Sequence, residues 1–383
     1  MTVGPRGARR LRAGHPWVFR DDVSEAAAAS SGDVVAVREA NGRALGFATF
    51  SRESKITLRA LTLEPRAPDR RFWAETIERA VALRRRTVRD SDAWRVLFGE
   101  SDGVPGLIAD LYGRHLVVQC LTRAAERLLP ELLEALAAHL AFDSVLARND
   151  PAVRELEGLP RVVEQLRGTT PEELELNEGG VRYVVDPRRG QKTGAFLDQR
   201  ENRLAAADYA RGRVLDVFAY QGGFGLHAAR RAEEVVGIDS SAVALARARR
   251  AAALSGLDNL VWVEANAFDE LRRREREGER FALVTLDPPA LAKSRGDLPA
   301  ARRAYKELNL RAMRLVEDGG MLVTSSCSYN LGEGEFLDVL AAAAADARRT
   351  FRVVEKRTQA RDHPLRLAFP ESHYLKCVVL GAV

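Results

Sequence analysis

The sequence predicts an α/β protein in three parts: a small β-barrel, a central α+β module and a doubly wound parallel sheet. Short strand patterns with turn residues between them fill residues 1–72. Mixed helix and strand patterns, without a cluster of chemical residues, fill residues 73–185. From residue 186 to residue 383, strands alternate with Gly-rich turns and helices, which is typical of a parallel sheet covered on both faces.

In the first part, Asn41-Gly42 separates two strand patterns and favours a tight hairpin turn. The predicted strands are residues 34–37, 45–50 and 56–61. A basic segment with Arg9, Arg10 and Arg12 comes first and leads to Trp17. Two interpretations fit this segment: a solvated arm with one aromatic pair in the core, or an RNA-binding surface.

The middle part combines both kinds of periodicity. The spacing predicts helices over residues 72–89 and 128–140, strands at 107–111 and 116–121, and a hairpin of residues 174–176 with 181–185. We assign no chemistry to this part.

The last part has the strongest pattern. Predicted strands are residues 214–218, 235–239, 260–263, 281–287 and 320–326, with helices at 226–232 and 242–255. In such sheets ligands bind beyond the carboxyl ends of the strands, so the residues that end these strands are candidates for a site.

Composition limits the class of protein. The 383 residues are 46% apolar and 30% charged, with a net charge of +5, as in an ordinary globular chain. No apolar run is long enough to span a membrane, and the N-terminus lacks a secretory signal, so we expect a cytoplasmic protein. Basic residues exceed acidic ones in the first and last parts but not in the middle, so a polyanion would bind at the ends. Cys120, Cys327 and Cys377 have no metal-ligand or disulfide spacing, and no metal is expected.

Asp216 near the end of the first strand is followed by a Gly-rich turn with Phe218, Gly222, Gly223 and Gly225. Glycine lets a backbone approach a ligand closely, and a carboxylate suits an ammonium group such as that of S-adenosylmethionine. The residues from Gly223 onward also fit a dinucleotide-binding pattern, so a nicotinamide cofactor is a competing interpretation.

Polar residues follow the next two strands. Asp239 can accept hydrogen bonds from ribose hydroxyls, which both cofactor classes carry. Asn266 can accept a bond from an adenine amino group, or it can cap the following helix.

Asp287, in Asp287-Pro288-Pro289, ends one strand, and Cys327 follows the last strand. A thiolate can attack C6 of a pyrimidine and make C5 a nucleophile for a methyl group. Asp287 would then contact the N3 edge of the base. Core packing is the alternative interpretation of Cys327.

Three strings extend these motifs along the chain: residues 10–19, residues 190–203 (GQKTGAFLDQRENR) and residues 363–376. With them, the sequence resembles the bacterial 23S rRNA cytosine-C5 methyltransferases that carry an N-terminal PUA domain. The resemblance implies a PUA-like barrel, a Rossmann-like catalytic domain, S-adenosylmethionine as cofactor and Cys327 as nucleophile. It also implies cofactor contacts from Lys192, Thr193, Gln199 and Asp287, and RNA contacts from the opening segment. Leu291 and Asn266 depart from the family pattern, which usually has an aromatic residue and Asp there.

Two further alternatives stay open. Asp-Pro-Pro is similar to the motif of N-directed methyltransferases, which need no cysteine, and an RNA-binding protein without catalysis would bind no cofactor. The expected partner is ribosomal RNA of the 23S class. The sequence does not decide between a monomer and a homodimer.

Overall fold

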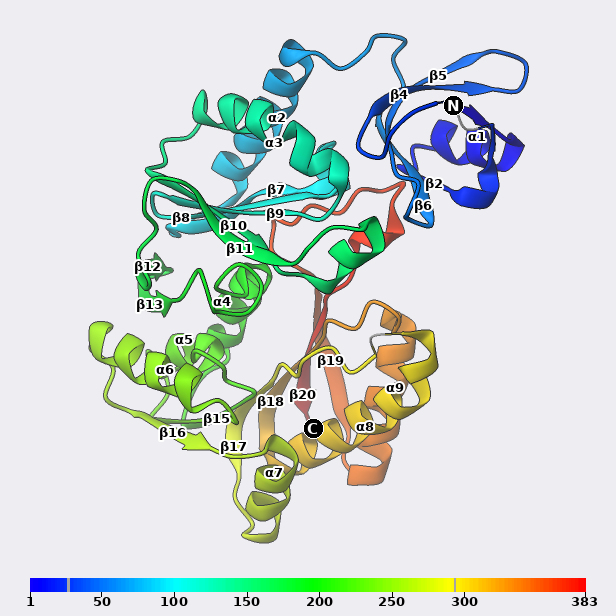
Figure 1. Cartoon of the computed structure of the whole chain (residues 1–383). Helices are drawn as coiled ribbons and strands as arrows, with labels where there is room; N and C mark the ends of the chain where they lie inside the picture. Colours follow the sequence, from blue (N-terminus) through cyan, green and yellow to red (C-terminus); the bar gives the residue numbers. More distant parts are fainter. Residues whose placement is uncertain (26–27, 293) are drawn as a thin grey trace. The chain divides into compact units, whose positions relative to one another are not determined.

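The computed structural model describes residues 1–25, 28–292 and 294–383. It divides into two compact units that interleave along the chain (Figure 1). Unit 1 contains residues 1–176, 186–197 and 361–372, and unit 2 contains residues 177–185, 198–360 and 373–383.

Unit 1 begins with a six-stranded sheet in the order β2-β6-β5-β4-β1-β3. Its elements are β1 (Thr2–Val3), α1 (Pro5–Arg12), β2 (Trp17–Phe19), β3 (Val23–Glu25), β4 (Val34–Glu39), β5 (Ala44–Phe50) and β6 (Ile56–Thr62). The predicted hairpin is β4 with β5, joined through Asn41-Gly42. The predicted solvated arm is wrong for residues 5–12, because this segment forms a helix that buries Ala8 and Leu11 in the core of the sheet.

A second sheet in unit 1 has the order β11-β10-β9-β8-β7. The elements are α2 (Arg70–Thr87), β7 (Ala93–Phe98), β8 (Leu107–Tyr112), β9 (His115–Cys120), α3 (Arg123–Ala137), β10 (Ser144–Asn149) and β11 (Val162–Arg167). Trp73 and Ile77 of α2 share a buried core with Leu129 and Leu132 of α3 and with the strands. Both helices were predicted, with α3 starting earlier because Thr122 caps it.

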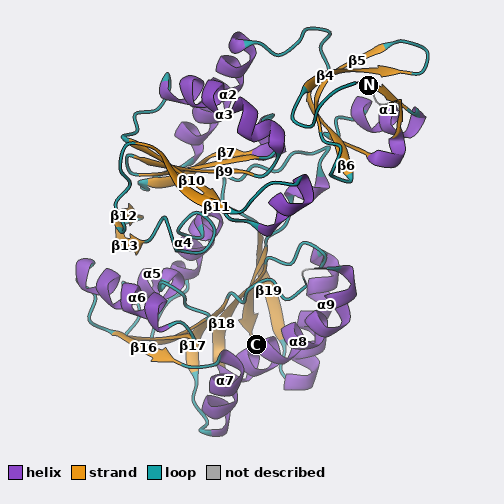
Figure 2. Ribbon diagram, viewed as in Figure 1, coloured by secondary structure: helices purple, strands orange, loops and turns teal. Residues whose placement is uncertain are grey.

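Unit 2 contains a seven-stranded sheet in the order β16-β15-β14-β17-β18-β20-β19. Figure 2 draws its strands in orange. The strands are β14 (Arg213–Val217), β15 (Glu234–Asp239), β16 (Leu260–Glu264), β17 (Phe281–Leu286), β18 (Val316–Ser326), β19 (Phe351–Arg357) and β20 (Lys376–Ala382). The helices are α4 (Arg200–Asp208), α5 (Gly223–Ala229), α6 (Ala242–Leu254), α7 (Ala267–Arg276), α8 (Leu298–Leu315) and α9 (Glu333–Ala347). The hairpin of β12 (Leu174–Glu178) and β13 (Val181–Val185) is the predicted one.

Neighbouring residues of each central strand face opposite sides of this sheet. Val214 packs with α4 and α5, whereas Leu215 packs with α7, α8 and α9. The same alternation holds for Leu283 and Val284 of β17. Helices therefore cover both faces, as the sequence predicted, and β14 to β18 run parallel with their carboxyl ends at one edge.

The predicted start of the last part at residue 186 differs from the division into compact units. Residues 186–197 belong to unit 1 because Thr193 is buried there, between the Tyr112 hydroxyl (2.8 Å) and the Asp110 carboxylate (2.6 Å). No helix of the described residues is long and apolar enough to cross a membrane.

Candidate active site

The carboxyl edge of the unit 2 sheet collects four predicted residues. Asp216, Asp239, Asp287 and Cys327 stand at or just beyond the ends of β14, β15, β17 and β18. β17 lies between β14 and β18 in the sheet, and Leu286 pairs with Thr324. The predicted juxtaposition of the Asp-Pro-Pro motif with the cysteine therefore exists in the fold.

Cys327 lies against the Asp-Pro-Pro motif. Its side chain is partly exposed, and its Sγ lies 4.0 Å from the carbonyl oxygen of Pro288. The backbone N–H of Asp287 points at the carbonyl of Val217 over 3.4 Å, which joins the same motif to the end of β14. Cys327 is thus partly exposed, and it lies beside a motif that is joined to the end of β14, the strand that leads into the glycine turn.

Cys120 and Cys377 differ from Cys327 in environment. Both are fully buried, and burial raises the pKa of each thiol to about 12. A thiol that stays protonated at neutral pH is a poor nucleophile. Among the cysteines of this chain, Cys327 therefore has the accessibility that a nucleophile needs.

Asp216 is turned into the protein. It is 1% exposed, its Oδ2 accepts the Gly225 N–H over 2.8 Å, and its Oδ1 accepts the Thr285 hydroxyl over 2.6 Å. Burial raises the pKa of Asp216 to about 6. The carboxylate fixes the glycine turn against β17, and its direct contact with a ligand ammonium stays a prediction.

Asp239 holds the other side of the same turn. Its Oδ2 accepts the N–H of Tyr220 and its Oδ1 that of Ser241, each over 2.8 Å. Each carboxylate oxygen has a second lone pair, so a pair of ribose hydroxyls can still be bound. This geometry is compatible with the predicted role of Asp239.

The glycines of the turn are needed for packing as well as for conformation. Gly222 has a φ of +81°, and a Cβ there would lie 2.4 Å from the Trp262 ring. A Cβ on Gly223 would lie 2.8 Å from Arg203, and one on Gly225 would lie 3.0 Å from Asp216. Phe218, also predicted as a cofactor contact, has a φ of +64° and packs partly buried on the core. The close approach of these residues to a ligand stays a prediction.

The side-chain amides of Gln199 and Asn266 both form hydrogen bonds with other residues of the chain. Gln199 donates to the Asp287 carboxylate over 2.9 Å and accepts from Asn202 over 2.7 Å. The Asn266 oxygen accepts the N–H of Phe268 over 2.9 Å, so it caps α7, which is the alternative that its position left open. Gln199 therefore orients Asp287, and an adenine contact from Asn266 stays a prediction.

Lys192 and Thr193 belong to unit 1, whereas the four strand-end residues belong to unit 2. Lys192 is exposed and its ammonium lies 4.6 Å from the centre of the Phe196 ring. Thr193 has the buried partners described above. Their assignment as cofactor contacts stays a prediction.

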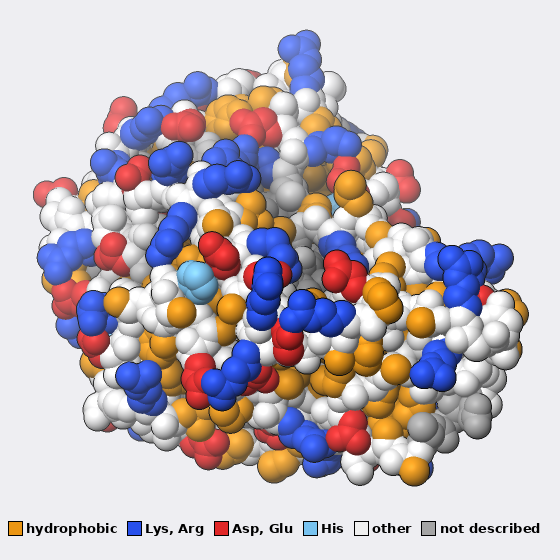
Figure 3. Space-filling model, turned by 90° about the horizontal axis from the view of Figure 1, so that it is seen from above, with side chains coloured by type: hydrophobic (Ala, Val, Ile, Leu, Met, Phe, Trp, Pro, Cys, Tyr) orange, Lys and Arg blue, Asp and Glu red, His pale blue; other side chains and the backbone are white. Residues whose placement is uncertain are grey.

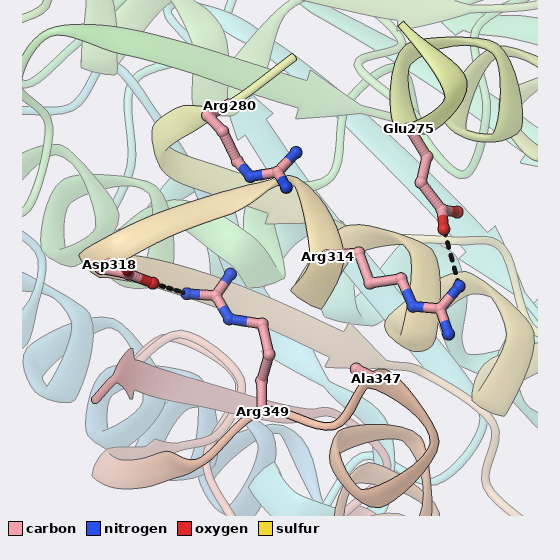
Figure 4. A pocket seen from close by; sticks show the side chains of 6 residues that line it. All are labelled: Glu275, Arg280, Arg314, Asp318, Ala347 and Arg349. Atoms are coloured by element: carbon pink, nitrogen blue, oxygen red, sulfur yellow. Dashed lines mark hydrogen bonds and ion pairs between the residues drawn. The ribbon is translucent and has the colours of Figure 1, made fainter. Parts of the chain in front are cut away.

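A cavity of about 410 Å³ opens at the opposite edge of the sheet. It is lined by Glu275, Arg280, Arg314, Asp318, Ala347 and Arg349, which Figure 4 draws. Arg280 directly precedes β17, so the cavity lies at the amino ends of the strands. Arg314 pairs with Glu275 and Arg349 with Asp318, so much of the positive charge is neutralised. The cavity is separate from the strand-end residues.

Comparisons with known proteins bear on the strand-end site. A family model of S-adenosylmethionine-dependent methyltransferases matches residues 106–365, and a PUA-like domain model matches residues 1–63. A Shewanella denitrificans protein named ribosomal RNA large subunit methyltransferase I is 40% identical over 389 residues, covering 99% of this chain and 98% of the relative. The chain belongs to this methyltransferase family. The Vibrio cholerae protein of the same name is 39% identical and covers 97% of each chain.

Solved structures confirm the fold. A Streptococcus mutans protein described as a SAM-dependent methyltransferase superposes with a TM-score of 0.83 at 19% identity, covering 100% of this chain and 99% of the other. A methyltransferase solved in complex with SAH superposes with a TM-score of 0.85, also at 19% identity and with the same coverage. The predicted PUA-like and Rossmann-like architecture and the predicted cofactor, S-adenosylmethionine, are those of the family.

A residue that the motif analysis missed supports the fit of this cofactor. Gln221 of the glycine turn is 5% exposed, and its side-chain nitrogen has no hydrogen-bond partner among the described residues. An unpaired buried donor costs free energy, so it indicates a missing acceptor. A bound S-adenosylmethionine carries carboxylate and ribose oxygens that can accept this bond. The glycine turn is recognised from its glycines and from Asp216, so no sequence pattern pointed to Gln221.

Of the residues in the opening segment predicted to contact RNA, three have partners within unit 1 and the fourth is exposed. Arg10 stacks over Phe19 and lies 3.5 Å from Asp22, and Arg12 pairs with Glu39. Trp17 donates to Glu100 over 2.8 Å and packs on Phe369. Arg9 is exposed. In Figure 3, Lys and Arg side chains are scattered over the face shown, with acidic side chains between them. RNA binding by these residues stays a prediction.

Proposed function

We propose that this chain methylates C5 of a cytosine in the RNA of the large ribosomal subunit, the 23S class, with Cys327 as the nucleophile. The observation that carries the proposal is the partly exposed Cys327 Sγ beside Pro288, at the carboxyl ends of the strands, where ligands bind in sheets of this kind. The names of the relatives from Shewanella and Vibrio supply the class of RNA.

The chemistry of the chain's own residues follows from this position. The Cys327 thiolate forms a bond to C6 of the cytosine, and the electron pair of the C5–C6 double bond makes C5 a nucleophile. S-adenosylmethionine supplies the methyl group that C5 takes. A base then removes the C5 proton, the C5–C6 double bond returns, and the bond between sulfur and C6 breaks, which restores Cys327.

Asp287 has the second role. It lies on the motif that contacts Cys327, and Gln199 holds its carboxylate in one orientation. We assign it to the N3 edge of the cytosine, where a protonated carboxyl group stabilises the charge that develops on the ring as the thiolate adds.

We divide the chain by function into three parts: residues 1–72 as a PUA-like RNA-binding domain, 73–185 as a central domain and 186–383 as the methyltransferase domain. Arg9, Arg10, Arg12 and Trp17 are assigned to RNA. We assign the enzyme to the cytoplasm because the proposed substrate is ribosomal RNA.

The test is methyl transfer to ribosomal RNA with a donor that carries an isotope-labelled methyl group, followed by mass spectrometry of the nucleosides. The proposal predicts label in 5-methylcytidine. Label in an N-methylated adenosine or guanosine would assign the chain to the N-directed class instead. Absence of transfer together with absence of heat on titration with S-adenosylmethionine would favour an RNA-binding protein without catalysis.

A further inference from the structure

The segment around Cys327 is held on both sides. The Ser326 hydroxyl donates to the Tyr305 oxygen over 3.0 Å, and the Tyr305 and Ser328 hydroxyls lie 3.0 Å apart. Ser328 also accepts the N–H of Ala292 over 3.0 Å. Both neighbours of the cysteine are thus anchored to α8 and to the loop after β17, which fixes where the sulfur lies.

A buried lysine lies next to this segment. Lys376 is the first residue of β20 and pairs with Ser326 across the antiparallel ladder of β18 and β20, two strands that lie side by side in Figure 1. Its side chain is buried, and its ammonium donates to the carbonyl oxygens of Ser328 (2.7 Å) and Tyr374 (3.0 Å). The ammonium therefore contacts the residue that directly follows Cys327 in the chain.

This position is costly for a lysine. Removing an ammonium from water is unfavourable unless an opposite charge compensates, and carbonyl groups do so only in part. Burial lowers the pKa of Lys376 to about 8, while negative charge on Cys327 and on Glu333 raises it. Glu333 is itself paired with Lys356 over 2.7 Å. Of these two negative charges, that of the Cys327 thiolate has the larger effect on the Lys376 ammonium.

We propose that Lys376 is a positioning residue whose buried ammonium stabilises the thiolate of Cys327 and so increases the fraction of enzyme that is ready to attack the base. This inference deepens the proposed function and rests on it for its catalytic meaning. Within residues 28–292 and 294–383, the titratable groups around Cys327 and Lys376 include Tyr305 from α8, Asp287 from the end of β17 and Glu333 from α9. A negative charge on Glu333, or on Asp287 before its carboxyl group is protonated, opposes ionisation of the thiol, and the ammonium of Lys376 offsets this effect.

The test follows alkylation of Cys327 by iodoacetamide as a function of pH, with the modified peptide identified by mass spectrometry. Lys376→Met removes both the charge and the donors, and Lys376→Gln removes the charge but keeps a donor for the Ser328 carbonyl. We expect both to move the alkylation midpoint upward by about one pH unit, a roughly tenfold slower reaction at neutral pH. Lys376→Arg should restore most of the rate.

Two controls separate charge from packing. Tyr305→Phe removes hydrogen bonds on both sides of Cys327 without changing a charge, so its midpoint should stay that of the unmodified enzyme. Cys327→Ser gives the background, which the buried Cys120 and Cys377 keep low. An unchanged midpoint in Lys376→Gln and Lys376→Met, or an equal shift in Tyr305→Phe, would overturn the proposal. The assay needs neither RNA nor methyl donor, so its outcome is independent of whether cytosine is the substrate.

Discussion

The Gln199 side chain donates a hydrogen bond to the Asp287 carboxylate over 2.9 Å, although the two residues lie 88 positions apart in the chain. Gln199 is in turn fixed by Asn202 at the start of α4, which donates to its carbonyl oxygen over 2.7 Å. The residue that faces the base in our proposal is therefore oriented by the segment that leads into α4.

This relationship predicts a specific kinetic effect of Gln199→Met. The variant should lose about tenfold in kcat, because the carboxylate is no longer held in its productive orientation. The affinity for S-adenosylmethionine, measured by calorimetry, should stay the same. A variant with unchanged kcat but weaker cofactor binding would instead support the direct cofactor contact that the sequence suggested for Gln199.

We expect Gln221→Met to stabilise the ligand-free protein but to weaken its binding of the cofactor. The substitution removes a buried donor that has no partner among the described residues, so the ligand-free protein should gain up to about 1–3 kcal/mol in its free energy of unfolding. Cofactor affinity should fall by about tenfold, because the acceptor on the ligand loses its donor. Melting temperatures with and without SAH measure both. A destabilised variant that binds SAH normally would contradict this role.

Asp216 predicts a pH dependence of stability. Burial raises the pKa of its carboxyl group to about 6, from an ordinary value of 3.8. Between these values the folded state holds a proton that the unfolded state releases, so this contribution is complete below about pH 4 and is lost as the pH rises through 6. Asp216→Asn keeps the size of the side chain but does not titrate.

The stability of the unmodified protein relative to Asp216→Asn should therefore fall by about 2 kcal/mol from pH 4 to pH 7. Urea unfolding at several pH values measures the difference, and the fluorescence of Trp262 reports on the glycine turn against which it packs. A difference that does not change with pH would show that Asp216 is not titrating in this range.

The strand-end positions of the site were predictable from the sequence. Asp216, Asp239 and Asp287 each close or directly follow a hydrophobic strand pattern, and a parallel sheet brings such ends to one edge. Cys327 was predicted for the same reason, because it directly follows the strand pattern that forms β18. The pairing of β17 with β18, which sets Cys327 against Pro288, follows from the regular alternation of strands and helices.

The partners of these residues were not predictable. Lys376 comes from β20, an antiparallel strand inserted between β18 and β19, and a single sequence gives no register for such an insertion. Whether Asp216 faces a ligand or the protein depends on Thr285 and Gly225, which only the three-dimensional packing brings together. The helix at residues 5–12 was missed because its many arginines mask the buried Ala8 and Leu11.

The central claim, that the sulfur of Cys327 bonds to C6 of a cytosine, is tested most directly by trapping the adduct. RNA with 5-fluorocytidine at the target site cannot release a C5 proton after methyl transfer, so the bond between sulfur and C6 should persist. We predict an RNA–protein complex stable to denaturation, with one added methyl group, whose crosslinked peptide contains Cys327. It should be absent in Cys327→Ala and present in Cys120→Ala. A crosslink at another residue, or full methyl transfer by Cys327→Ala, would contradict the account.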